Sequence, residues 1–165
     1  MSQEVPTDQL KQAVGRFASG VTVVTVRDER EDIDDDIGTT VTAFASVSLE
    51  PPRVLVSIAA DSYMDEVLGR QGRWTVSLLA AGQTQVAGRF ATAARPSGRL
   101  LLANLPHHRG THSDALVVDG GLAALECETR QRVPAGDHTV IVAGVLAVDY
   151  VSDGEPLLHF RGRYR

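Results

Sequence analysis

Residues 38–58 read GTTVTAFASVSLEPPRVLVSI, and this stretch decides what fold the chain is expected to have. In an extended strand, alternate side chains lie on opposite faces. One face would carry only apolar side chains, namely Val41, Ala43, Ala45, Val47 and Leu49. The other would carry hydroxyls with one aromatic ring among them, namely Thr40, Thr42, Phe44, Ser46 and Ser48. This second face is polar but has no charge, unlike most strand faces that meet water.

Two explanations fit the neutral face. Threonine favours strands in many settings, and serine is tolerated there. Alternatively, neutral hydroxyls and exposed backbone line a groove that holds a planar, polar ligand or its phosphate. Ala43 and Ala45 would then let a large ring approach the backbone closely. The pattern leaves both explanations open and does not identify the ligand.

The rest of the chain is mostly strand-like around this stretch. Pro51 and Pro52 cannot donate ladder hydrogen bonds, so the strand at 38–50 should end there. β-Branched and apolar runs predict further strands, and helical spacing with capping residues predicts a few short helices. The predicted strands are 21–26, 38–50, 54–60, 74–79, 121–133, 138–151 and 157–161; the predicted helices are 7–18, 62–70 and 83–91; 92–112 is predicted as a long loop and 134–137 as a turn.

Strands and helices do not alternate regularly, so a doubly wound parallel sheet is not expected. A small, mostly antiparallel barrel is favoured, because closure removes exposed sheet edges. The sequence shows no internal repeat or interdomain linker. We therefore expect a mainly β protein with a few short helices and a single domain over residues 1–165.

Charge is concentrated in one segment. The chain has 16 Lys and Arg against 21 Asp and Glu. Residues 28–37, DEREDIDDDI, hold seven acids and one arginine, which leaves 14 acids and 15 basic residues elsewhere. The segment is interpreted as a solvated hairpin tip, with a docking site for a basic partner as the alternative. No basic stripe indicates nucleic acid.

The sequence lacks the motifs that identify several classes of protein. No phosphate-binding loop, GxGxxG, GxSxG or CxxC is present, so any nucleotide cofactor must be held in another way. No apolar run approaches the roughly 18–20 residues that cross a bilayer. The N-terminal residues lack a secretory signal pattern, and one cysteine cannot form an internal disulfide. A cytoplasmic protein with no membrane partner is expected.

Three further features each have a structural and a functional interpretation. His107, His108 and His112 could ligate a metal but stand in a Pro- and Gly-rich segment, which favours polar loop residues and no metal site. Cys127 lies within a predicted strand and is expected to be a buried, inert thiol. His138 follows the Gly136–Asp137 turn and is either a surface histidine or a contact to a bound anion or amide.

Six segments in this order resemble the flavin reductase-like family, short-chain NAD(P)H:flavin oxidoreductases with an FMN-binding split barrel. They are FASGVTVVTV (17–26), GTTVTAFASVSLEPPRVLVSI (38–58), WTVSLLAAGQTQVAGRFA (74–91), LAALECE (122–128), GDHTVIVAGV (136–145) and EPLLHFRGRY (155–164). The resemblance covers residues 10–164. It implies a Greek-key split β-barrel and a homodimer with flavin near the subunit interface. It also implies hydride transfer from NADH or NADPH to FMN or FAD, often to supply a partner monooxygenase with reduced flavin.

The resemblance also assigns roles to residues. Those expected along the flavin and its phosphate side are Thr42, Ala43, Phe44, Ala45, Ser46, Ala59, Ala60, Asp61, Ser62, Arg89 and Phe90. Those expected at the nicotinamide cofactor are His138, Arg161 and Tyr164. No side chain is expected to act as a general acid or base, because the protein's task is to orient two cofactors.

The sequence departs from the family's pattern at the phosphate side. Ala59, Ala60 and Asp61 lack a basic residue that some relatives have there, which leaves FMN and FAD both open. No clamp for a 2′-phosphate is evident, which favours NADH over NADPH. Two other functions stay open: an electron carrier of the same fold that retains its FMN, and a non-enzymatic small-molecule binder.

Overall fold

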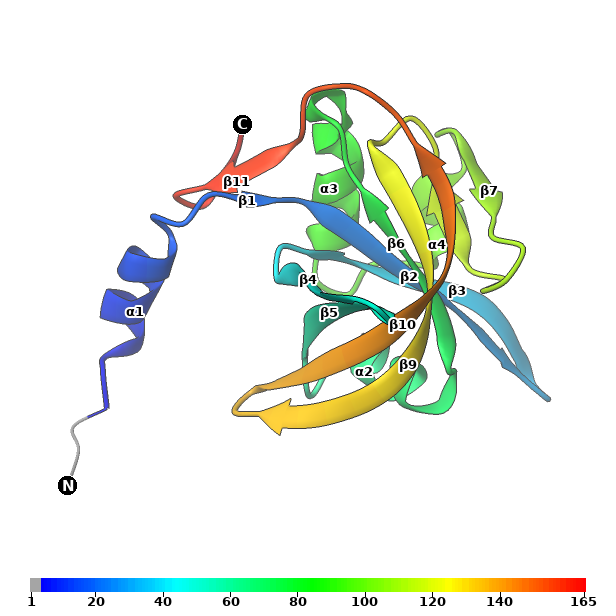
Figure 1. The fold of residues 1–165 in the computed structure, drawn as a ribbon, viewed down its shortest axis with the longest axis horizontal. Coiled ribbons are helices and arrows are strands. Elements are labelled where there is room, and N and C mark those ends of the chain that lie inside the picture. Colours follow the sequence, from blue (N-terminus) through cyan, green and yellow to red (C-terminus); the bar gives the residue numbers. More distant parts are fainter. Residues whose placement is uncertain (1–3) are drawn as a thin grey trace.

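A computed structural model describes residues 4–165, and one antiparallel sheet of seven strands dominates it (Figure 1). The strand order is β3-β2-β6-β9-β10-β5-β4. These strands are β2 (Thr22–Arg30), β3 (Ile33–Val41), β4 (Phe44–Leu49), β5 (Pro52–Ala59), β6 (Arg73–Leu78), β9 (Ala123–Ala135) and β10 (His138–Val151). The expected mainly β split barrel with a few short helices is confirmed.

The sheet is rolled, because its two edge strands are joined directly. β3 and β4 lie at opposite edges, yet only Thr42 and Ala43 separate them in the chain. The Phe44 amide donates to the Thr42 carbonyl at 3.1 Å, a tight γ-turn, and the Ser57 amide donates to the Ala43 carbonyl at 3.1 Å. The edges therefore meet at this junction, which is the closed end of the barrel.

The expected single strand at 38–50 is wrong for the same reason. The turn at Thr42–Ala43 moves the chain between sheet edges and interrupts the alternation of faces. Of the five residues predicted on the apolar face, only Val41 is buried, and Leu49 is 84% exposed. Phe44 instead packs partly against the core.

The acidic segment also differs from its prediction. β2 and β3 run through it, and only the turn at 31–32 lies outside the two strands. The side chains of Asp28 and Asp36 are 0% and 1% exposed, so a solvated tip describes only the turn. Both buried carboxylates pair with arginines from distant parts of the chain, described below.

The core has two parts, one on each side of β2. Val24 and Val26 pack with Trp74 and the inner face of helix α2 (Tyr63–Arg70), whereas Val21 and Val23 pack with Phe90. Alternation with period two thus buries both faces of the β-branched run VTVVTV. This arrangement makes β2 the centre of the molecule.

The helices interrupt the sheet at the expected places. The Ser62 hydroxyl accepts from the Asp65 amide at 3.1 Å and caps α2, as the sequence predicts. α1 ends at Val14 and not at residue 18, and the predicted loop 92–112 contains a short helix, α4 (Gly98–Leu102), and a short strand, β7 (His107–Arg109). The helices are α1 (Thr7–Val14), α2 (Tyr63–Arg70), the 3₁₀ turn η1 (Ala81–Gln83), α3 (Thr84–Ala91) and α4 (Gly98–Leu102).

Five short strands form two small sheets beside the large one. β11 pairs with β1 and β12, so the C-terminal segment lies against residues 19–20. β7 pairs with β8. Their bounds are β1 (Ser19–Gly20), β7 (His107–Arg109), β8 (Leu116–Val118), β11 (Leu158–Phe160) and β12 (Arg163–Tyr164).

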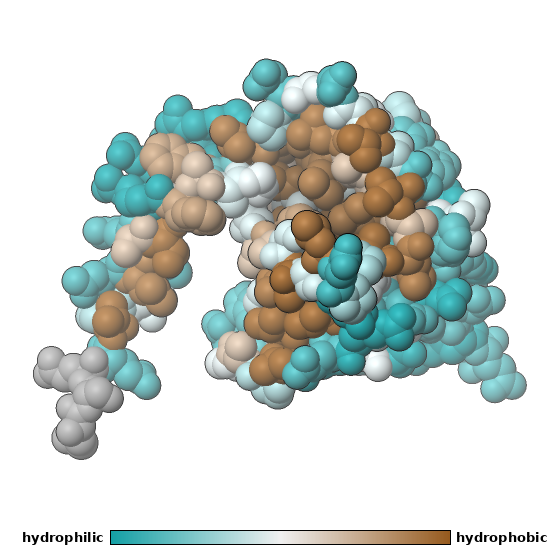
Figure 2. Space-filling model, viewed as in Figure 1, coloured by the Kyte–Doolittle hydropathy of each residue, from teal (hydrophilic) through white to brown (hydrophobic). Residues whose placement is uncertain are grey.

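The N-terminal arm, residues 4–18, stands away from the barrel (Figure 1). α1 buries none of its residues, and Leu10, Val14 and Phe17 are 53%, 58% and 79% exposed. Figure 2 shows apolar surface both on this arm and on the part of the body that it overhangs. Within residues 4–165, no helix has the length and apolar character needed to cross a bilayer.

Candidate functional site

A cavity of about 310 Å³ opens at the junction of β3 and β4, and we call it the central pocket. Its walls come from the junction itself, the end of β5, the start of α2 and the β9–β10 hairpin. The residues that line it are Thr39, Thr40, Val41, Thr42, Ala43, Ser57, Ile58, Ala59, Ser62, Arg95 and His138. Hydroxyls, small side chains and backbone make up most of this surface, and it has no carboxylate.

Hydrogen bonds within the protein hold the residues of the central pocket in place. Thr40 donates its hydroxyl to the Ala87 carbonyl at 2.7 Å, which ties β3 to α3. Ser62 donates its hydroxyl to the Ala59 carbonyl at 2.7 Å while capping α2. The strand register places His138 beside Ala59. The pocket is therefore preformed by the barrel and not by a loose loop.

Arg95 is the cation of the central pocket. Its Nε donates to the Gly38 carbonyl and its Nη1 to the Thr92 carbonyl at 3.3 Å. No carboxylate lies within ion-pair distance of it in residues 4–165, and burial lowers the pKa of its guanidinium. Ala94 adopts φ +50°, a left-handed conformation that is uncommon for alanine and costs roughly 1–2 kcal/mol. This strained turn aims an uncompensated cation at the pocket.

Sequence reasoning missed Arg95 because it lies in the segment interpreted as a loop. A signal was nevertheless present. Residues 67–113 contain six arginines and not one Asp or Glu. Four of these arginines form ion pairs with acids, and Arg89 binds a backbone carbonyl outside the central pocket. Arg95 is the one of the six that has no acid partner in the described part of the chain and also lines the pocket.

His138 lines the central pocket from the β9–β10 hairpin. Its Nδ1 is 2.7 Å from Asp137 Oδ1, and this hydrogen bond, together with the histidine's charge, lowers the pKa of the Asp137 carboxyl. The bond orients the ring and leaves Nε2 for another partner. Because 45% of the His138 side chain is exposed, a bound molecule can reach it.

A second cavity of about 610 Å³, the N-terminal pocket, adjoins the central pocket and shares Thr42 and Ala43 with it. Phe44 and Ala45 line it from β4, and Phe17 lines it from the N-terminal arm. The two cavities therefore meet at the β3–β4 junction.

The structure brings together part of the residue set predicted from the resemblance. The central pocket contains Thr42, Ala43, Ala59, Ser62 and His138, and the N-terminal pocket adds Phe44 and Ala45. Ser46, Ala60 and Asp61 are exposed and line neither pocket. The central pocket also contains residues outside the predicted set, above all Arg95, Thr39 and Ser57.

Arg89 and Phe90 have partners inside the protein. The Arg89 guanidinium donates to the Leu101 carbonyl at 2.7 Å and so joins α3 to α4. Phe90 is fully buried, and its ring lies so close to Gly38 that a Cβ there would meet it at 2.5 Å. Neither side chain lines the central pocket.

Arg161 and Tyr164 lie near the N-terminal arm. Arg161 lines a cavity of about 340 Å³ beside α1 that shares Gly15 and Gly162 with the N-terminal pocket, and its guanidinium is 5.0 Å from the centre of the Phe160 ring. Tyr164 packs edge-on against His159, and burial raises the pKa of its hydroxyl. His159 lines the N-terminal pocket, so this C-terminal segment faces the same side of the junction.

The other candidate residues have structural surroundings. His107, His108 and His112 bind separate partners, and no group of three His, Cys, Asp or Glu within residues 4–165 is arranged to hold a metal ion. Cys127 is fully buried, and burial, with a smaller effect of the Glu126 charge, raises the pKa of its thiol to about 12. The predicted burial of this thiol is confirmed.

Comparison with known proteins relates this geometry to a family. The model of the flavin reductase like domain matches residues 14–165. The chain is 41% identical over 165 residues to an NADH-dependent flavin reductase from Rhodococcus sp, with 100% of this chain and 89% of the relative covered. It is 39% identical over 158 residues to the reductase component of 4-hydroxyphenylacetate 3-monooxygenase from Thermus thermophilus, with 96% and 95% covered.

Solved structures show the same likeness. An NADH:FAD oxidoreductase from Streptomyces globisporus, in complex with NAD and FAD fragments, superposes with a TM-score of 0.87 at 32% identity over 99% of this chain and 96% of that one. BorF, the flavin reductase component of a bacterial two-component tryptophan halogenase, superposes with a TM-score of 0.87 at 32% identity over 97% of both chains.

Proposed function

Because the chain belongs to the flavin reductase-like family, we propose that it transfers a hydride from NADH to a flavin and that the central pocket holds the flavin. The whole chain, residues 1–165, acts as one domain. The reduced flavin then passes to a monooxygenase component, as the named roles of its relatives suggest. The observation that carries the proposal is a neutral, preformed pocket with one unpaired cation at its wall.

The residues of the central pocket fit a flavin phosphate and ring. Ala43 and Ala59 allow a flat ring close to the backbone, and the neighbouring hydroxyls and amides offer hydrogen bonds to its polar edge. Arg95 supplies the cation that the loop at 59–61 lacks, because a guanidinium binds phosphate with parallel hydrogen bonds. The polar groups are few and the walls are small, as is typical of cofactor sites.

The protein contributes orientation and exclusion of water. When bound, the flavin supplies the chemistry by accepting at N5 the hydride that leaves nicotinamide C4. The β3–β4 junction lies between the central and N-terminal pockets, so it supports the ring from the backbone side. His138, oriented by Asp137, hydrogen-bonds the nicotinamide cofactor. No acid or base is needed in this transfer, and the gain in rate comes from proximity.

A cytoplasmic homodimer is part of the proposal. The exposed apolar side chains of α1 and the apolar surface beneath the arm form a face that a second copy would cover. The single buried cysteine suits a reducing compartment. Light scattering tests the assembly: a mass near 17.7 kDa would contradict the dimer.

NADH oxidation, followed by the absorbance of the reduced nicotinamide with FMN or FAD added in turn, tests the activity. His138→Ala is expected to raise the KM for NADH about tenfold, the value of one hydrogen bond to a charged group, with little change in flavin affinity. His107→Ala, on β7 and away from both pockets, is the matched control and should leave the KM unchanged.

Three outcomes would contradict parts of this proposal. No NADH oxidation with either flavin would exclude the reductase. A chain that retains FMN through purification but oxidises NADH very slowly would point to an electron carrier. An unchanged KM in His138→Ala would remove His138 from its proposed role.

A further inference from the structure

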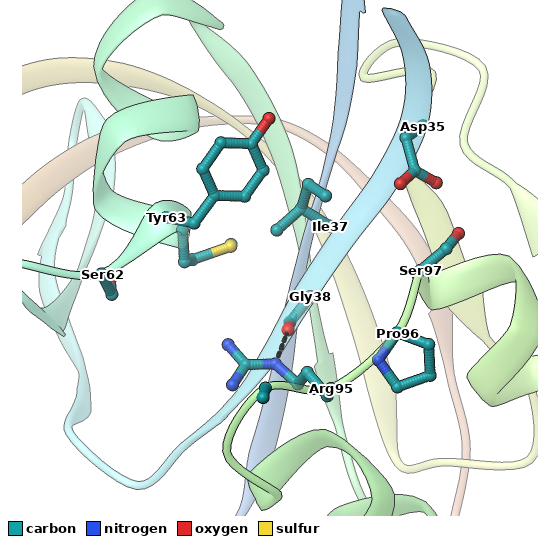
Figure 3. A pocket seen from close by; sticks show the side chains of 10 residues that line it. Asp35, Ile37, Gly38, Ser62, Tyr63, Arg95, Pro96 and Ser97 are labelled. Carbon is teal, nitrogen blue, oxygen red and sulfur yellow. Dashed lines mark hydrogen bonds between the residues drawn. The ribbon is translucent and has the colours of Figure 1, made fainter.

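A further cavity, of about 410 Å³, adjoins the central pocket at Arg95. We call it the Tyr63 pocket. It shares Ser62 and Arg95 with the central pocket, so the two cavities meet at the proposed phosphate position. Figure 3 shows β3 across its middle, Tyr63 on one side, and Ser97 with Pro96 on the other. A flavin phosphate at Arg95 would therefore stand at the entrance to an additional space.

Tyr63 is anchored by a buried ion pair. Its hydroxyl donates to Asp28 Oδ2 at 2.6 Å and lies 3.2 Å from both Arg70 Nη2 and Arg30 Nη2. Asp28 is fully buried, and the Arg70 guanidinium lies 5.6 Å from the centre of the ring. These contacts fix the ring, although the residue is 45% exposed. An exposed aromatic ring held in this way is a ready surface for stacking a base.

The polar groups of the Tyr63 pocket suit a nucleotide. Arg95 lies at the entrance, where a phosphate can bind. Asp35 lies on the far side of the pocket from Arg95 (Figure 3), and one of its oxygens accepts from the Asp36 amide at 2.8 Å. Its other oxygen can accept from ribose hydroxyls, as an acidic residue does in dinucleotide sites.

We propose that the Tyr63 pocket receives the adenosine monophosphate part of FAD and that the chain therefore binds FAD more tightly than FMN. The inference rests on the proposed function, because the flavin must first occupy the central pocket. Tyr63 stacks on the adenine, Asp35 binds the ribose, and Arg95 lies between the two halves of the dinucleotide.

NADH carries the same adenosine group, but the geometry favours FAD. The Tyr63 pocket opens next to Arg95, and none of the three residues assigned to the nicotinamide cofactor lines it: Arg161 and Tyr164 lie near the N-terminal pocket, and His138 lines the central pocket alone. An adenosine group that is joined to the flavin phosphate reaches the Tyr63 pocket directly.

Equilibrium titration of the flavin-free chain with FAD and with FMN, followed by flavin fluorescence, tests the proposal. Wild type is expected to bind FAD more tightly. Tyr63→Ala should weaken FAD binding about tenfold, the typical value of one base stacked on an aromatic ring, and leave FMN binding within about twofold. Tyr63→Phe is the matched control, because it keeps the ring and should keep the FAD preference.

Asp35→Ala provides a test that leaves the Asp28 ion pair intact, in case Tyr63→Ala does not fold. This substitution should weaken the binding of FAD and leave the binding of FMN unchanged. Equal affinities of wild type for FAD and FMN would overturn the inference, as would an equal loss of both flavins in a folded variant. If either variant raised the KM for NADH with FMN as acceptor but kept the wild-type preference for FAD, the pocket would be assigned to NADH. That result would also overturn the inference. Failure of wild type to bind either flavin would instead refute the proposed function.

Discussion

The β2–β3 hairpin and the central pocket differ in whether their charged side chains have ion-pair partners. In the hairpin, each buried carboxylate has arginine partners: Asp28 pairs with Arg70, and Asp36 pairs with Arg99 and Arg109. In the central pocket, Arg95 has no acid partner within residues 4–165, and no carboxylate lines the surface around it. The hairpin's buried charges are neutralised by partners within the protein, whereas the central pocket has a cation that is available to a ligand.

The difference shows how to separate structural from ligand-binding charge. Asp36 is fully buried, whereas Arg95 is partly exposed and lines the central pocket. A buried charge with internal partners stabilises the folded chain, and its loss strands those partners. A half-buried charge without a partner contributes little to folding and is instead suited to an anionic ligand. Substitutions in the two regions should therefore affect different measurements.

Asp36→Asn is expected to give the largest effect, on stability. The change removes the buried carboxylate that Arg99 and Arg109 share, and each guanidinium keeps only an exposed acid, Asp34 or Asp114. We expect a loss of about 3 kcal/mol in the free energy of unfolding, the lower end for a broken buried ion pair because both arginines are partly exposed. Chemical denaturation measures this loss.

Asp32→Asn is the matched control, because Asp32 is exposed in the turn of the same hairpin. It should change the free energy of unfolding by less than about 0.5 kcal/mol. Equal effects of the two substitutions would show that internal pairing does not distinguish the hairpin's buried acids.

Arg95→Ala is expected to act on ligand affinity. Removing a charge-assisted contact to phosphate should weaken FMN binding roughly 10- to 100-fold. Riboflavin, which has the same ring and no phosphate, should bind the variant and wild type equally well. Fluorescence titration measures both ligands, and Arg163→Ala, an exposed arginine on β12, controls for net charge. A parallel loss of riboflavin binding would place Arg95 at the ring and not at the phosphate.

His108 provides the smallest effect, a pH dependence of stability. Its Nδ1 lies 2.6 Å from Asp119 and its Nε2 lies 2.9 Å from Asp149. Burial lowers the pKa of His108, but the hydrogen bonds and charges of the two carboxylates outweigh it and raise the pKa. The stabilisation is thus complete below the ordinary histidine pKa of about 6.5 and is lost as pH rises through the raised value.

Thermal unfolding of His108→Gln across this pH range checks the prediction. Wild type should become slightly less stable as pH rises above about 6.5, and the variant should not show this decline. The decline in wild type should be small because the histidine is partly exposed. His107→Gln should keep the decline, since His107 Nδ1 contacts only the Leu105 carbonyl. Identical pH profiles for wild type and His108→Gln would refute the role of this contact.

Much of the fold could be predicted from local patterns. The run at 21–26, the cap at Ser62, the turn before His138 and the apolar spacing of α3 each have one local cause, and each element forms where it was expected. The strand at 38–50 could not be predicted correctly, because its break at Thr42–Ala43 serves the closure of the barrel. Closure depends on strands that are far apart in the sequence.

The site was predictable in part for the same reason. The neutral stretch identified one wall of the central pocket, including Thr42 and Ala43. The acids of 28–37 and the arginines of 67–113 are separated by many residues, and only the fold shows that they pair with each other. Arg95 becomes conspicuous only after that pairing is known, because it is the arginine left over in the pocket.

Direct flavin binding tests the central claim, that a neutral pocket with one uncompensated arginine accepts a flavin. Purified, flavin-free protein is titrated with FMN and with FAD at low and high salt while flavin fluorescence is recorded. We predict saturable quenching with one site per chain, weakened by salt because the phosphate meets Arg95. Fluorescence that stays unchanged with both flavins at either salt concentration would contradict the account.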